Sequence, residues 1–195
     1  AVAFYSLLGN ADCGFKASVL AKEGKTETSV PDSYQTPFNT NILISGNIIT
    51  NCGNVKDIYA DYEPLAISFI GKNLKKALRQ NADGSGGYPK GNYYISGITI
   101  KNNTINTAGD GIYLENIRNI AVDNNSITCA KSKYSKKVCN PITALTVNFN
   151  SISGNAIDSA PYHGMELAES SIKALNNNSV TNTSLDGIIL EAESK

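Results

Sequence analysis

The stretch Ile98–Asn116, ITIKNNTINTAGDGIYLEN, places two short isoleucine-rich runs around a double asparagine and then adds a Gly-Ile pair. Its first half has the form apolar-x-[Asn/Gly]-Asn-x-apolar. The same form occurs in five windows: Ile44–Ile49, Ile100–Ile105, Val122–Ile127, Ile152–Ile157 and Leu175–Val180. From Asn103 onward its second asparagine recurs at steps of 22, 30 and 23 residues. A repeat of this length indicates a stacked, repetitive architecture.

A second half follows each of these windows. It covers Ala66–Phe69, Gly111–Leu114, Ala144–Val147, Gly164–Leu167 and Gly187–Leu190. Alternate residues are apolar in each, which is the period-2 pattern of a strand with one buried face. The sequence therefore predicts an all-β solenoid in which strands of successive repeats pair in parallel and isoleucine, leucine and valine fill the interior.

The double asparagine is interpreted as a tight bend between two strands. Asparagine tolerates left-handed backbone geometry, and its amide can bond the equivalent asparagine of the next repeat. The bend also contains the N-x-[Ser/Thr] sequence of glycan acceptors at Asn102, Asn124 and Asn177, with a fourth copy at Asn182. Because the first three coincide with the bend, we expect them to form the ladder rather than to carry glycans.

The repeat resembles the right-handed parallel β-helix of the pectate-lyase-like superfamily over residues 41–193. The resemblance implies a right-handed single-stranded parallel β-helix of about five coils with loop insertions, covering residues 41–195. Residues 1–40 fit the repeat less well and are expected to form an irregular N-terminal cap or a partial coil. The superfamily contains lyases, hydrolases, epimerases, phage tailspikes and adhesins, so the fold does not select an activity.

The composition excludes few partners. Lys+Arg and Asp+Glu are both 17, so the net charge gives no indication of a nucleic-acid partner, and no apolar run is long enough for a membrane span. Both ends of the sequence look cut, so we expect a mature product or a fragment of a longer chain. The resemblance implies an extracellular or virion-surface location and, for a tailspike, a homotrimer.

Cys129 and Cys139 bracket the short segment Ala130–Val138. A disulfide there would restrict the unfolded chain and stabilise the fold by roughly 2–3 kcal/mol. An even cysteine count suits an oxidising compartment, but reduced, buried cysteines would give the same sequence. Both alternatives remain open at this point.

Three insertions interrupt the repeats: residues 52–64, 71–92 and 131–137. In the superfamily that the chain resembles, polysaccharide binds along the sheet that such insertions flank. Lys72–Arg79 has the pattern of a basic amphipathic helix, and Lys133 and Tyr134 lie in a basic loop. These features favour an anionic glycan, although charge runs are more often solvated faces. A calcium site near Asp57, Asp61 and Glu63 is conceivable but lacks a recognisable ligand spacing.

The candidate site follows from the alternation in the Gly-Ile strands. If their apolar residues point inward, an outward column consists of Ser68, Tyr113, Thr146, Glu166 and Ile189, and a second one contains Glu115. Asp110, Thr143, His163 and Asp186 precede these strands, and His163 and Asp186 take equivalent places in adjacent coils. A histidine oriented by an aspartate, with a carboxylate nearby, suits general acid/base chemistry on a sugar. The expected catalytic residues are His163, Glu166, Asp186 and Asp110. The expected substrate-binding residues are Tyr113, Glu115, Arg118, Thr146, Tyr134 and Lys133.

Two functions remain at this stage. The leading prediction is a β-helix protein that binds polysaccharide and cleaves it as a hydrolase or lyase; Arg118 is the nearest candidate for a lyase base. The alternative is a non-catalytic adhesin or structural spacer, in which His163 is a polar residue at a turn. The sequence lacks the paired-aspartate and Gly-His-Gly signatures of polygalacturonases and the Asp-Pro-His of alginate epimerases, so no known mechanism is carried over. No cofactor is expected, apart from the calcium ion considered above.

Overall fold

The computed structural model describes residues 2–7, 41–52, 65–72, 95–131 and 139–191. These residues form β-strands and connecting bends, without a helix, and every strand pair recorded among them is parallel. The prediction of an all-β fold built from parallel strands is therefore confirmed. The three predicted insertions, the basic amphipathic helix and the conceivable calcium ligands lie largely or wholly outside the described residues.

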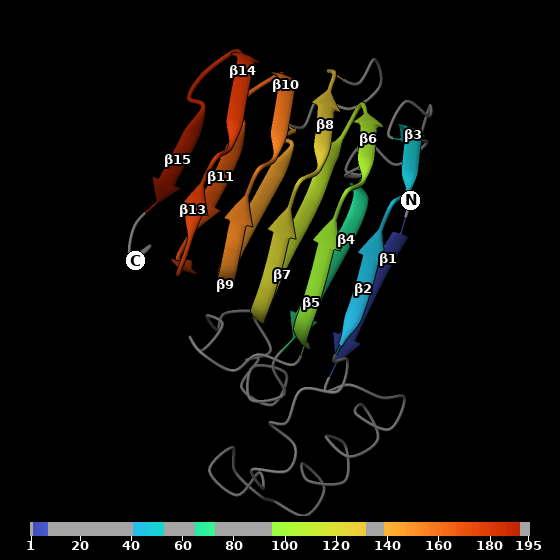
Figure 1. Cartoon of the computed structure of the whole chain (residues 1–195), viewed down its shortest axis with the longest axis vertical. Coiled ribbons are helices and arrows are strands. Elements are labelled where there is room, and N and C mark those ends of the chain that lie inside the picture. Colours follow the sequence, from blue (N-terminus) through green and yellow to red (C-terminus); the bar gives the residue numbers. More distant parts are fainter. Residues whose placement is uncertain (1, 8–40, 53–64, 73–94, 132–138, 192–195) are drawn as a thin grey trace, which may run out of the picture.

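The larger sheet contains ten strands (Figure 1). Six lie along one path, which we call the site sheet: β1 (Val2–Leu7), β4 (Leu65–Lys72), β7 (Asp110–Asp123), β9 (Ile142–Ser153), β11 (Met165–Ala168) and β15 (Ile188–Glu191). Four more pair beside it: β2 (Ile42–Ser45), β5 (Ile95–Lys101), β12 (Ser171–Ile172) and β13 (Leu175–Asn176). The long strands β7 and β9 belong to both groups, because their first halves continue the site sheet and their second halves pair with β5, β12 and β13.

The second sheet has five strands in the order β14-β10-β8-β6-β3. They are β3 (Ile48–Cys52), β6 (Thr104–Thr107), β8 (Ser126–Cys129), β10 (Ala156–Ala160) and β14 (Ser179–Thr183). Each strand pairs with the one from the preceding and the following repeat, so the sequence repeat and the sheet order coincide.

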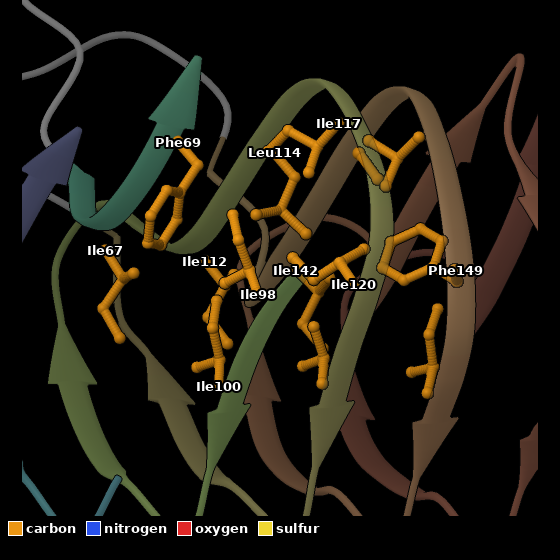
Figure 2. Packing of buried hydrophobic residues seen from close by; sticks show 14 of the residues in the cluster. Ile67, Phe69, Ile98, Ile100, Ile112, Leu114, Ile117, Ile120, Ile142 and Phe149 are labelled. Atoms are coloured by element: carbon orange, nitrogen blue, oxygen red, sulfur yellow. The ribbon is translucent and has the colours of Figure 1, made fainter. Parts of the chain in front are cut away.

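The core consists of the apolar residues that alternate along these strands. Ile67, Ile112 and Ile142 are register partners in β4, β7 and β9 and form a row from one strand to the next (Figure 2). All three are fully buried, as is Phe149 farther along β9. Such stacking explains why isoleucine recurs at this place in three successive strands, since a branched side chain fits the same gap each time; in β11 the partner of Ile142 is Met165.

The double-asparagine bend contains the predicted ladder. Asn103, Asn125 and Asn155 are each 1 % exposed. The backbone N–H and the side-chain Nδ2 of each donate to Oδ1 of the equivalent asparagine in the next repeat, as when Asn103 donates to Asn125 at 3.1 and 2.9 Å. The ladder starts at Asn47 and ends at Asn178. We call it the asparagine ladder.

A second bend separates the two halves of the long strands. Its equivalent residues are Asn116, Thr146 and Glu169, with φ of 57°, 56° and 48°. Thr146 is 9 % exposed, and left-handed geometry is a genuine outlier for a β-branched residue. The predicted alignment placed Thr146 beside Tyr113 and Glu166, and that register was wrong by three residues.

Replacing Thr146 with asparagine is expected to raise the free energy of unfolding by about 1 kcal/mol. Left-handed geometry costs most residues roughly 1–2 kcal/mol, whereas asparagine adopts it readily and already occupies the equivalent bend at Asn116. Urea unfolding of Thr146→Asn measures the effect. Thr143→Asn on the same strand is the control and should be neutral or destabilising; a Thr146→Asn variant less stable than the wild type would contradict the strain argument.

Candidate functional site

The candidate site lies on the outward face of the site sheet. The register places Tyr113 of β7 beside Thr143 of β9, and Thr143 beside Glu166 of β11. All three side chains are half-buried. Tyr113 Oη donates to Glu115 Oε2 at 3.3 Å, which joins this row to the next outward position on β7. Hydrogen-bonding side chains from three neighbouring strands therefore form a continuous polar row.

Asn140 donates hydrogen bonds to two residues of the polar row, and it was not among the site residues predicted from the sequence. It is 3 % exposed. Its Nδ2 donates to Glu166 Oε2 at 2.6 Å and to Thr143 Oγ1 at 3.4 Å. It precedes Pro141 and belongs to none of the sequence patterns described above. Its place, two residues before the first inward residue of the strand, matches that of Asp110, His163 and Asp186 and would have identified it.

The four residues at this place form a second ladder, which we call the cap ladder. Asp110 Oδ1 accepts the backbone N–H of Asn140 at 2.7 Å, and Asn140 Oδ1 accepts the backbone N–H of His163 at 2.9 Å. His163 Nδ1 lies 3.3 Å from the backbone nitrogen of Asp186. The side chains of Asp110 and Asn140 thus each accept from a backbone donor of the following repeat, where the chain turns into its strand. This role explains polar residues at a buried bend without catalysis.

His163 and Asp186 come together as predicted. Asp186 Oδ2 lies 3.3 Å from His163 Nδ1, and the Tyr162 ring packs edge-on against the imidazole at 4.2 Å between centroids. Nδ1 cannot donate to this carboxylate and accept from the Asp186 backbone at once, so the tautomer decides between the two contacts. The Asp186 side chain is 64 % exposed, and a pair so open to water contributes little to stability.

The other predicted site residues lie away from the polar row, beneath the surface, or outside the described residues. Arg118 is exposed on the second half of β7, where its register partners are Ser96 and Asn148, and so lies beyond the Asn116 bend from the polar row. Thr146 lies in that bend and not in the row. Lys133 and Tyr134 are outside the described residues. Asp110 is 2 % exposed, so its carboxylate supports the backbone beneath the surface.

Cys129 and Cys139 form no disulfide, and both are 2 % exposed. The structure therefore has the reduced alternative of the two left open by the sequence. Cys129 Sγ lies 2.9 Å from the Gly109 carbonyl. Burial raises the pKa of the Cys129 thiol far above its ordinary value of 9.0, and the Asp110 carboxylate and Cys139 add to the effect.

This pKa predicts a loss of stability in alkali. Above about pH 9 the unfolded chain releases the Cys129 proton while the folded protein retains it, so stability falls as the pH rises, by up to about 1.4 kcal/mol per pH unit. Urea unfolding at about pH 8 and about pH 10 measures the slope. Cys129→Ala should have a shallower slope than the wild type; equal slopes would show that another group is responsible.

Among the described residues, no group of three or more histidine, cysteine, aspartate or glutamate side chains is placed to hold a metal ion. No helix in this part of the chain is long and apolar enough to cross a membrane. Comparisons with protein-family models, with curated proteins and with solved structures found no significant match. The functional argument therefore depends on the fold and on the geometry of this face.

Proposed function

We propose that the chain is a right-handed parallel β-helix, similar in fold to the pectate-lyase-like superfamily, that binds a polysaccharide along the outward face of the site sheet. The observation that carries the proposal is the polar row of Tyr113, Thr143 and Glu166, which the Tyr113–Glu115 and Asn140–Glu166 hydrogen bonds hold in place. A parallel sheet with donors and acceptors on neighbouring strands suits an extended chain of hydroxyl groups. Under this proposal the protein acts outside the cell or on a virion surface, where such chains are found.

The charges of this face favour a neutral glycan. The described ionisable side chains that this face exposes are mostly acidic: Glu115, Glu166, Asp186 and Glu191, with the buried His163 next to Asp186. Carboxylates accept hydrogen bonds from sugar hydroxyls but repel uronate or sulfate groups. The lysines that favoured an anionic glycan in the sequence lie almost wholly in segments outside the described residues, so the described face supports a neutral one.

The cap ladder favours binding over cleavage. Glycoside hydrolysis needs two carboxyl groups roughly 5–5.5 Å or 6.5–9.5 Å apart that both reach the scissile bond. Glu166 is half-buried, Asp110 is buried and bonded to the Asn140 backbone, and the exposed Asp186 contacts His163. The non-catalytic alternative, an adhesin or spacer, gains support from the same observation. We therefore propose glycan binding as the function and treat cleavage as a separate outcome of the test.

The test is binding of the purified protein to neutral and acidic polysaccharides by calorimetry, with reducing ends and unsaturated uronates assayed in parallel. Loss of one hydrogen bond to a charged group corresponds to roughly 1.5–3 kcal/mol, so we expect Glu166→Ala to weaken binding about tenfold to a hundredfold. Tyr113→Ala should weaken it in the same direction.

Asn106→Ala, on the exposed side of the five-stranded sheet, is the matched control and should bind as the wild type does. New reducing ends that Glu166→Gln abolishes would make the protein a hydrolase. Unchanged binding by Glu166→Ala, or no binding of any polysaccharide by the wild type, would overturn the proposal and leave the spacer.

A further inference from the structure

The two asparagines of each bend have different roles, contrary to the expectation from the sequence. The second asparagine forms the buried ladder. The first is exposed and has left-handed geometry: φ is 55° at Asn102, 55° at Asn124 and 53° at Asn177. These three first asparagines are the ones that begin N-x-[Ser/Thr], so the expectation that they form the ladder was wrong.

In each acceptor sequence, both the asparagine and the third residue are exposed. The third residue of each, Thr104, Ser126 or Ser179, is exposed and begins a strand of the five-stranded sheet. Within the described part of the chain, the side chains of Asn102, Asn124 and Asn177 make no hydrogen bond, whereas the ladder asparagines that follow them do. The amide that would be modified is therefore free, and the amide that holds the fold is a different one.

We propose that Asn102, Asn124 and Asn177 form an N-glycan acceptor ridge along this edge. In the reaction, Nδ2 of an asparagine bonds to C1 of a sugar carried on a lipid or nucleotide pyrophosphate. The bond from C1 to the phosphate oxygen breaks, the pyrophosphate leaves with its electron pair, and Nδ2 gives up one proton. The third-residue hydroxyl identifies the acceptor to the transferase.

The spacing of the ridge limits how many glycans fit. Thr104 pairs with Ser126, and Ser126 pairs with Ala156, which pairs with Ser179. Asn102 and Asn124 are therefore in neighbouring repeats, about 4.8 Å apart, too close for two glycans. Gly154 occupies the repeat between Asn124 and Asn177, so no side chain intervenes there. We expect one glycan on the Asn102/Asn124 pair and one on Asn177.

The experiment is secretion of the chain from a host with N-glycosylation, in an Asn182→Gln background that removes the fourth acceptor sequence. Asn182 is left out because its Nδ2 donates to Asp158 Oδ1 at 2.7 Å. Intact mass before and after peptide-N-glycosidase counts the glycans, and peptide mapping locates them as aspartates. The expected result is occupancy of Asn177 and of one member of the Asn102/Asn124 pair.

A second variant separates recognition from folding. Thr104→Ala, Ser126→Ala and Ser179→Ala together keep every asparagine and should abolish all glycans while the melting temperature of the deglycosylated protein stays unchanged. The folded protein from a host without glycosylation is also treated with a soluble N-glycosyltransferase and UDP-glucose, which should add hexose at the same positions. A secreted protein without glycans on the ridge, or a folded protein that accepts no hexose there, overturns the proposal.

Discussion

Replacing Asn125 with leucine is expected to lower the free energy of unfolding by about 3–6 kcal/mol. Three groups lose their partner in this variant: the backbone N–H of Asn103, one hydrogen of Asn103 Nδ2 and the Ile100 carbonyl. All three lie in the interior, and a buried polar group left without a partner costs about 1–3 kcal/mol. Leucine has the same number and branching of side-chain heavy atoms as asparagine, so the substitution leaves no cavity.

The measurement is urea unfolding followed by circular dichroism. Asn106→Leu, an exposed asparagine in β6 only a few residues from the ladder, is the control and should change stability by less than about 0.5 kcal/mol. A domain of this kind is typically stable by about 5–15 kcal/mol, so the Asn125 variant should lose a large part of its stability. If both variants unfold at the same urea concentration, the ladder does not contribute as described.

Replacing Gly111 with alanine is expected to destabilise the protein by about 3 kcal/mol. Gly111 leads into the site sheet, and a Cβ there would lie 2.5 Å from the Pro141 carbonyl oxygen and 2.8 Å from Ile127 Cγ2. The first of these neighbours is backbone in the next repeat, so the two repeats would have to separate. Glycine is therefore required at this point by the approach of the next strand.

Gly187 provides a matched control, because it occupies the equivalent place immediately before β15. The nearest atoms to a Cβ at Gly187 are those of Val180, at 3.8 and 3.9 Å, which is ordinary contact. Gly187→Ala should therefore be neutral or slightly stabilising, since alanine has fewer unfolded conformations. Thermal or urea unfolding compares the two variants. If both variants lose the same free energy of unfolding, these positions require glycine for its backbone conformation and not because the neighbouring strand approaches closely.

Much of the fold could be predicted from the sequence because its signals repeat. The alternation around Ile67 and Ile112 predicted register partners that the structure confirms, and the recurring asparagine predicted the ladder. These patterns are local: period 2 marks a strand, and asparagine marks a left-handed bend.

The register of β9 could not be predicted in this way. Ile142, Ala144, Leu145 and Val147 fit the alternation in two phases, on either side of the bend at Thr146. A threonine in a sequence does not indicate left-handed geometry. The alignment that placed Thr146 in the polar row therefore fitted the alternation of apolar residues as well as the correct one did. The same shift concealed the place of Asn140, since Pro141 stands where three other repeats have Gly111, Gly164 and Gly187. The His163–Asp186 contact was found because both of its repeats retain the glycine.

The asparagine ladder also gives the stack of repeats a polarity. The Oδ1 atoms accept from the preceding repeat, and one Nδ2 hydrogen of each asparagine before Asn178 donates to the following one. Asn178 Nδ2 donates back to the Ile152 carbonyl, and for its other donors the described residues offer no acceptor in a following repeat; Leu175 and Leu190 are also exposed in this last repeat. A group that covers this side well has to bring an oxygen to the position of the next asparagine. Two copies meeting by the same end would set donor against donor, so the fold selects against symmetric end-to-end pairing.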